Sequence, residues 1–378
     1  MDHQKLDYID AVRGWAILLV ITCHVGGMFA ELPYPVKKLT NFGCHGVQLF
    51  FLASAVTLLL SWNRVKERDA AKTRHFFLRR FFRIAPMYYA GALLYFLVDP
   101  PEDGFDLLQL LRTLLFVNVW QPEGIPTTPG WIVVPGGWSI GVEFTFYALF
   151  PILATLVTSL PRALLFFVCA MAVAFGSNQA GAVWLSAYSE TASGNFLYFW
   201  FPNQMPVFAL GFVLYFVLRR TPAFGLRVLT TYACLAALLV AYVALAEHPG
   251  TGSKFSLHNP APPILLASLL FMVFILLLGR GPATLATHPF IRKIGVLSFS
   301  AYVLHFLFVH QIPRLSGGLI DTGATGYAAI ASFALLWSAT LLATIGTSYL
   351  AHRLIELPGV ELGRRLTVRR GPRLVAGD

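Results

Sequence analysis

Ten long apolar segments follow one another along this 378-residue chain. An α-helix needs about 20 apolar residues to cross the hydrocarbon core of a bilayer, and a helix buried in a bundle can be shorter. Charged residues make up only 12% of the chain, about half of the share that soluble domains carry. We therefore predict an all-α integral membrane protein of about ten transmembrane helices with no soluble domain. The predicted spans are residues 11–30, 44–62, 84–99, 137–158, 163–176, 198–218, 228–246, 263–279, 294–312 and 326–351.

The distribution of lysine and arginine predicts the orientation of these spans. With a cytoplasmic N-terminus, the inner segments hold 21 of the 28 basic residues and the outer segments hold five. This asymmetry follows the positive-inside rule and places both termini in the cytoplasm. Counting the apolar run 107–120 as a further span would put every later basic cluster outside, so we expect a re-entrant or interfacial helix there. The expected parts are a transmembrane domain over residues 1–358 and a basic cytoplasmic tail over residues 359–378.

The first apolar run contains three ionisable residues, Asp10, Arg13 and His24. It lacks the basic leader and the cleavage site of a signal peptide, so we expect a retained span. Arg13 and His24 are eleven residues apart, which in a helix is ~16 Å along the axis and ~20° around it. Ionisable groups inside a membrane span are costly and indicate a functional site. The alternative is that Arg13 extends to the inner interface and His24 is a hydrogen-bonded interior histidine.

A basic segment follows the second predicted span and ends in Arg79-Arg80-Phe81-Phe82-Arg83. Arg80 and Arg83 stand three residues apart, on one face of a helix at the membrane surface. Two guanidinium groups at this spacing suit a phosphate group. The alternative is a topology signal that also contacts anionic lipid.

Two further spans carry polar residues on one face. Ser139, Glu143 and Tyr147 follow one another at intervals of four residues after Trp138. Glu143 lies at a depth similar to that of His24, so we expect it to fix the histidine tautomer and stabilise the imidazolium. The alternative is a structural ion pair.

Later in the chain, Tyr302 and His305 share a helical face, and His310 lies further out. His305 is a candidate acid, base or substrate contact, or else a packed interior residue. Two outer loops, Gln121–Gly137 and Gly176–Asn195, are long enough to bind a ligand or to be disordered. Trp120, Trp131 and Trp138 border the first loop, and they fit either sugar stacking or an interfacial aromatic belt.

The four cysteines, Cys23, Cys44, Cys169 and Cys234, lie in or beside apolar runs and form no CxxC pair. This pattern argues against a disulfide framework and against a metal site. Cys23 precedes His24, but neighbouring helix residues point about 100° apart. We therefore expect Cys23 to be a small packed residue rather than a nucleophile.

Six motifs in order resemble the acyltransferase 3 family of ten-span membrane acyltransferases. They lie at Ile9–His24, Gly46–Leu60, Arg79–Tyr89, Trp138–Pro151, Ser298–His305 and Leu354–Pro358. The resemblance implies a cytoplasmic acyl-CoA donor, acetyl-CoA most often, and O-acylation of a cell-envelope glycan or glycolipid. It also matches Arg13, His24, Arg80 and Arg83 to the family's first-span Arg and His and to its RxxR pair.

The chain departs from the family pattern at two points. The usual Ser-Gly-Phe reads Ser54-Ala55-Val56, which implies a reshaped acyl slot. The soluble esterase-like domain that follows the spans in some members is not found, so any later transfer step is expected within the spans or on a partner.

The leading hypothesis is acyl transfer across a bacterial inner membrane. Arg80 and Arg83 hold the phosphates of CoA, the pantetheine arm passes Arg13, and His24 acts as general base or transient acyl carrier with Glu143 and His305 as further catalytic residues. Ser139, Tyr147 and Trp138 contact the substrate. Membrane lipid and a glycan or glycolipid acceptor are the expected partners, with no metal and no nucleic acid, and a homo-oligomer stays open. The alternatives are a proton-coupled transporter that uses His24, Glu143 and His305 as a relay, and an assembly subunit of an envelope polymer complex.

Overall fold

The computed structural model describes residues 7–65, 69–101, 104–122, 131–246 and 262–367, and within these ranges every regular element is a helix. In chain order they are α1 (Asp7–Gly27), α2 (Tyr34–Gly43), α3 (Gly46–Arg64), α4 (Asp69–Val98), α5 (Leu107–Leu114), η2 (Asn118–Trp120), α6 (Trp138–Leu156), α7 (Leu160–Trp184), α8 (Glu190–Phe199), α9 (Phe201–Arg220), α10 (Val228–Ala246), α11 (Pro263–Arg280), α12 (Pro289–Val296), α13 (Ser298–Leu315), α14 (Gly326–Ala351), η4 (His352–Glu356) and α15 (Leu357–Thr367). The predicted all-helical class is confirmed.

Eight helices in the described ranges are long and apolar enough to cross a membrane, or nine when one bent pair is counted as a single span. The bent pair is α12 and α13, which meet at 78°. Each predicted span falls on a helix, but α10 is classed among shorter apolar helices. The structure therefore supports a multi-pass bundle, whereas the number ten and the sidedness of the termini stay predictions.

Several segments outside the predicted spans are helical as well, and two of them bear on the sequence predictions. Residues 107–120 form the short helix α5 and the turn η2, and neither is among the candidate spans. The prediction of a loop at Gly176–Asn195 is wrong, because α7 continues to Trp184 and α8 begins at Glu190. Alanine and polar helix formers carry the helix through this serine- and glycine-containing stretch. Residues 123–130 of the other expected loop, Gln121–Gly137, lie outside the described residues.

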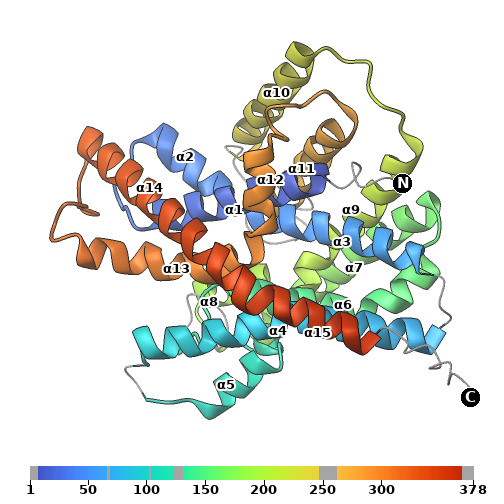
Figure 1. Ribbon diagram of the computed structural model, residues 1–378, viewed down its shortest axis with the longest axis horizontal. Helices are drawn as coiled ribbons and strands as arrows, with labels where there is room; N and C mark the ends of the chain where they lie inside the picture. The colour runs from blue at the N-terminus through green and yellow to red at the C-terminus, as the bar shows by residue number, and fades with distance from the viewer. Residues whose placement is uncertain (1–6, 66–68, 102–103, 123–130, 247–261, 368–378) are drawn as a thin grey trace, which may run out of the picture.

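Helix α1 is central, with α2, α3, α11, α12, α13 and α14 packed around it (Figure 1). Its closest neighbour is α12, because Gly14 and Gly295 face each other there. A Cβ atom at Gly295 would lie only 1.7 Å from the carbonyl oxygen of Asp10. Small residues at a helix contact let the two backbones approach closely. This approach places the start of α13, directly after the bend, beside α1.

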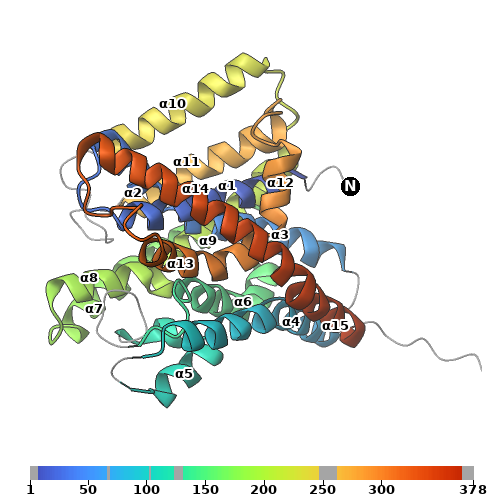
Figure 2. The same cartoon turned by 60° about the vertical axis from the view of Figure 1, so that its left-hand side comes forward.

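The C-terminal helices close the bundle on one side. Helices α14, η4 and α15 follow one another as a long rod, and α15 lies along α4 in both views (Figures 1 and 2). Two of the six sequence motifs, Ser298–His305 and Leu354–Pro358, meet here: Ser300 Oγ donates a hydrogen bond of 2.8 Å to the buried Glu356 carboxylate. His352 Nδ1 lies 3.0 Å from the same carboxylate. Helix α15 covers the beginning of the expected tail, and residues 368–378 lie outside the described ranges.

The cysteine prediction is wrong at one pair. Cys23 in α1 and Cys44, at the end of α2, form a disulfide with a Cα–Cα distance of 5.0 Å. No spacing pattern in the sequence indicates this bond, because α2 folds back as a separate short helix against α1. That fold-back brings two cysteines 21 residues apart into contact. Cys169 and Cys234 are free and exposed.

Candidate active site

A small polar cavity lies inside the bundle between α1, α3, α4, α6 and α13. Its volume is about 90 Å³, which is room for roughly three water molecules at liquid density. We call it the arginine pocket, because three arginines line it together with one carboxylate and several hydroxyl groups. Its polar lining residues are Arg13, Ser54, Arg80, Arg83, Ser139, Glu143, Tyr147, Ser298 and Tyr302. Six of the nine predicted site residues are therefore brought together here.

Arg80 and Arg83 enter the pocket from α4, as their spacing predicts. The guanidinium carbon of Arg80 lies 5.9 Å from the ring centroids of both Phe76 and Tyr147. When aromatic rings lie next to a guanidinium group, its N–H groups still point outward in the guanidinium plane. There they can donate hydrogen bonds to a planar anion. The aromatic neighbours thus fix one of the two guanidinium groups of the predicted pair.

Arg13 reaches the pocket from the N-terminal half of α1. Its Nη2 lies 3.4 Å from Thr57 Oγ1 on α3. That hydroxyl also donates to the backbone carbonyl of Ala53 at 2.9 Å. Thr57 therefore presents oxygen lone pairs to the guanidinium group and holds it at the wall between α1 and α3.

Glu143 is the carboxylate of the pocket, and it accepts a hydrogen bond from Ser54 Oγ. It lies within electrostatic range of Arg13 and Arg80. A partly buried carboxylate next to arginines is stabilised by their charge, and in return it offsets the repulsion between the guanidinium groups. In the described part of the chain no hydrogen bond joins Glu143 to His24, the contact that the sequence led us to expect.

The two histidines meet each other instead, above the arginine pocket along α1 and α13. The ring centroids of His24 and His305 lie 5.2 Å apart. Both rings pack on Phe306, with centroid distances of 4.2 Å and 4.3 Å. His305 is fully buried, whereas His24 is partly exposed. His24 is therefore the histidine that a ligand can reach.

The backbone determines the tautomer of His305. Its Nδ1 lies 2.7 Å from the carbonyl oxygen of Tyr302. A carbonyl only accepts, so Nδ1 carries the proton and Nε2 of the neutral ring has a lone pair. Nε2 is buried and has no hydrogen-bond partner among the described residues. His305 therefore has a free hydrogen-bond acceptor, Nε2, on the side of the ring opposite the Nδ1–H group.

Tyr302 lies between the histidine pair and the arginine pocket. Its carbonyl holds His305, while its side chain lines the pocket. The Tyr302 hydroxyl donates to the carbonyl of Gly136 at 3.0 Å and accepts from Ser139 Oγ at 2.8 Å. This buried network joins the loop before α6 to α13, so it fixes the shape of the pocket wall.

Sequence reasoning missed Ser54, which lines the arginine pocket, and Thr57, which contacts Arg13. Both lie on α3 among apolar residues, and only the departure at Ser54-Ala55-Val56 drew attention to that stretch. Tyr302 was indicated by sharing a helical face with His305. Trp138, in contrast, is buried in an aromatic cluster, 4.6 Å from the Phe199 ring by centroids. It does not line the arginine pocket, and its substrate role stays a prediction.

A second cavity of about 340 Å³ lies at the end of the bundle that the charge pattern assigns to the outside. We call it the outer cavity. Its lining includes Asp99, Trp131, Phe306, His310 and Arg314. Arg314 and Asp99 form an ion pair of 3.5 Å. Phe306 belongs to this cavity on one side and packs on His24 on the other, so the outer cavity reaches the neighbourhood of the histidine pair.

A bundle of apolar helices with arginines and histidines gathered in its interior defines a multi-pass membrane protein that has a polar site inside the membrane. Comparison with known protein families identifies the family within this class of membrane proteins. The chain belongs to the acyltransferase 3 family, whose acyltransferase domain matches residues 6–353. The resemblance seen in the six sequence motifs is thereby confirmed, and the protein is an enzyme that transfers acyl groups.

A curated relative covers almost the same length. The chain is similar to the acyltransferase MdmB of Streptomyces mycarofaciens, with 30% identity over 392 residues, which is 97% of this chain and 95% of the relative. No solved structure matches the chain.

Proposed function

We propose that this enzyme takes an acyl group from acyl-CoA on the cytoplasmic side and transfers it to a hydroxyl group that arrives from the opposite side of the membrane. The observation that carries the proposal is the alignment of the arginine pocket and the histidine pair along the same two helices, α1 and α13. Arg13 and His24 both lie on α1, ~16 Å apart by helical rise. This is about the span of a pantetheine arm between phosphate and thioester.

The arginine pocket supports the donor side. Arg80 and Arg83 offer guanidinium groups to the CoA phosphates at the membrane surface, and Arg13 lies deeper. Guanidinium groups bind phosphate oxygens through paired N–H donors. The volume of about 90 Å³ admits a narrow chain and a short acyl group rather than a whole cofactor. We therefore propose acetyl-CoA as the co-substrate, with its nucleotide outside the pocket.

The histidine pair supports the chemistry. A ring nitrogen of His24 takes the proton of the acceptor hydroxyl while its oxygen attacks the thioester carbonyl. The tetrahedral intermediate collapses with cleavage of the C–S bond, and the imidazolium returns the proton to the CoA thiolate. The products are an ester and free CoA. His305 packs against the His24 ring and on Phe306, and we propose that this contact orients His24, the positioning role first expected of Glu143.

The developing oxyanion needs hydrogen-bond donors. Neutral His305 offers none at Nε2, because its ring proton is held at Nδ1. Hydroxyl groups are the other candidate donors: Tyr147 and Ser139 both line the arginine pocket, and Ser139 would turn its proton from Tyr302 to the oxyanion. We propose them as oxyanion partners, with Glu143 keeping the arginines in place through its contact with Ser54.

The outer cavity supports the acceptor side. Its volume of about 340 Å³ lies within the ~300–1,000 Å³ range of small-molecule sites. Trp131 gives a stacking surface, and Asp99, Gln311 and Arg314 give polar groups, a combination that suits a sugar. We propose a saccharide or glycolipid of a bacterial cell envelope as the acceptor, and the inner membrane as the location.

The test uses the purified protein in vesicles with acetyl-CoA and a surface-glycan fraction as acceptor. CoA thiol should be released only when both substrates are present, and mass spectrometry should show the acceptor heavier by one acetyl group. Glycans from cells with and without the protein give the same comparison in vivo. No acceptor-dependent CoA release, together with an unchanged glycan mass, would contradict the proposal.

A proton-coupled transporter is the second candidate, favoured by the adjacent His24 and His305. Buried histidines in contact can relay a proton through a membrane protein. Vesicles that show solute counterflow without acyl-CoA would support the transporter. CoA release that depends on the acceptor would exclude it as the main activity.

A further inference from the structure

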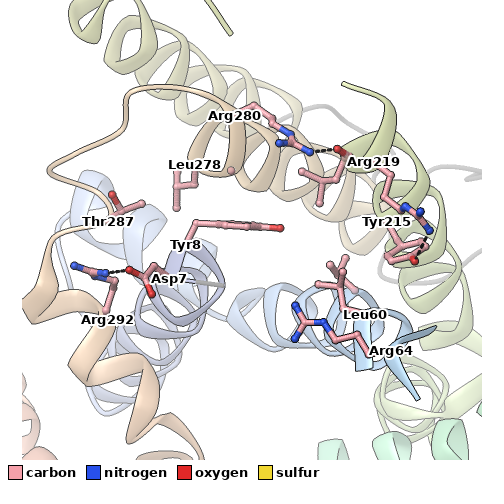
Figure 3. A pocket seen from close by; sticks show the side chains of 13 residues that line it. Asp7, Tyr8, Leu60, Arg64, Tyr215, Arg219, Leu278, Arg280, Thr287 and Arg292 are labelled. Carbon is pink, nitrogen blue, oxygen red and sulfur yellow. Dashed lines mark hydrogen bonds and ion pairs between the residues drawn. The ribbon is translucent and has the colours of Figure 1, made fainter. Parts of the chain in front are cut away.

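A third cavity, of about 300 Å³, lies between α1, α3, α9, α11 and α12, outside the site described above (Figure 3). Four arginines from four different helices or loops line it: Arg64, Arg219, Arg280 and Arg292. We call it the four-arginine cavity. All four lie in or beside segments that the charge pattern assigns to the cytoplasmic side. The ring of Tyr8 points into the cavity, with the arginines on different sides of it (Figure 3).

The charges of this cavity do not balance. Asp7 is the single carboxylate among the described residues that line it, and it pairs with Arg292. Arg219 donates to the Tyr215 hydroxyl at 3.0 Å, and Arg280 donates to the backbone carbonyl of Leu218. These neutral acceptors leave the guanidinium charge in place. Over the lining residues that the structure describes, positive charges therefore exceed negative ones by three.

Donor groups remain available as well. The Nε atoms of Arg280 and Arg292 are buried and have no hydrogen-bond partner among the described residues. A buried N–H group without an acceptor is costly, and one on a charged group more so. An anion in the cavity would supply both the missing acceptors and the missing charge.

The four-arginine cavity is separate from the arginine pocket. Val56, Leu60 and Arg64 line it from α3 at intervals of four residues, which is one helical face. Ser54 lines the arginine pocket from the same helix. Ser54 and Val56 are two residues apart and so point about 200° apart around the helix. The two cavities therefore lie on opposite sides of α3.

We propose that the four-arginine cavity binds a phosphate or diphosphate group carried on an apolar or aromatic body. Guanidinium groups are the side chains best matched to phosphate oxygens, because their planar forks give paired donors. Leu60, Leu278 and the Tyr8 ring give the apolar surface for the rest of the ligand. Two sources have this chemistry: a phospholipid of the inner leaflet with an exposed phosphate, and a soluble nucleotide.

The test measures binding to the full-length protein carrying Arg80→Gln and Arg83→Gln, so that the arginine pocket no longer contributes and the outcome does not depend on acyl-CoA binding. Inorganic pyrophosphate and ADP are the soluble probes, measured by calorimetry. Phosphatidic acid in nanodiscs is the lipid probe, measured by native mass spectrometry. Adding Arg64→Gln and Arg219→Gln should weaken binding by roughly tenfold or more, since each removes a charged donor.

Arg220→Gln is the matched control, because Arg220 follows Arg219 at the same helix end but does not line the cavity. It should leave binding unchanged, and thermal unfolding should show that all variants are folded. Binding of pyrophosphate or ADP assigns a soluble ligand, and retention of phosphatidic acid alone assigns a lipid. Absence of binding by every probe, or an equal loss in Arg220→Gln, would overturn the proposal.

Discussion

The imidazole rings of His24 and His305 lie 5.2 Å apart, one partly exposed and the other fully buried. The buried ring is held by a backbone carbonyl and directs a lone pair away from it. A pair of this kind has unequal members: one can meet a substrate, and the other can only act through its neighbour. This inequality leads to the first prediction.

His24→Ala should lower acyl transfer by roughly 10²–10⁴-fold, the usual contribution of a general base. His305→Gln should lower kcat less and leave the KM for acyl-CoA unchanged, because His305 acts by orienting His24. Initial rates of CoA release at several acyl-CoA concentrations separate the two effects. Near-normal turnover in a folded His24→Ala protein would remove His24 from the mechanism.

Arg80→Gln should raise the KM for acyl-CoA by roughly tenfold or more, since a charged hydrogen bond to phosphate contributes about 1.5–3 kcal/mol. Arg79→Gln is the matched control: Arg79 is exposed, donates to the carbonyl of His75 at 3.2 Å and does not line the arginine pocket. The measurement is steady-state kinetics in vesicles. An equal rise in KM for both variants would show that general surface charge, and not the pocket, attracts the cofactor.

Cys23→Ser combined with Cys44→Ser should destabilise the protein by about 3 kcal/mol, the effect of closing a loop of this size in the unfolded chain. The disulfide holds α2 on α1 one residue from His24, so reductant should lower the thermal unfolding temperature of the native protein and of the Cys169→Ser control, but not that of the double variant. Cys169→Ser is the control, since Cys169 is free and exposed. If reductant leaves the unfolding temperature of the native protein unchanged, the protein does not contain this disulfide.

Gly295→Ala should destabilise the bundle by ~3 kcal/mol or more, because the new methyl group would overlap the carbonyl of Asp10 and push α12 away from α1. The control is Gly346→Ala in α14, where a Cβ atom meets nothing within 4 Å. There alanine should be neutral or stabilising, since it favours the helix more than glycine does. Unfolding temperatures of both purified variants test the contrast.

The sequence by itself determined the class of the fold and the contents of single helices. Long apolar runs with few charges have no stable state except a helical bundle in a membrane. The 3.6-residue period then fixed the direction of each side chain around its own axis, so the pairing of Arg80 with Arg83 on one face was predictable. Six ordered motifs were enough to indicate the family.

Tertiary structure decided which helix stands opposite each of those faces. Glu143 was expected beside His24 because their depths agree, yet it meets Ser54 and the arginines, while His24 meets His305. The Cys23–Cys44 bond and the four-arginine cavity also join segments that are far apart along the chain or unrelated in sequence. The helical period fixes the direction of a side chain around its own helix, and the length of the apolar run fixes its depth in the membrane. Which side chains contact each other across helices depends on how whole helices pack. Gly14 and Gly295, for example, let α12 approach α1.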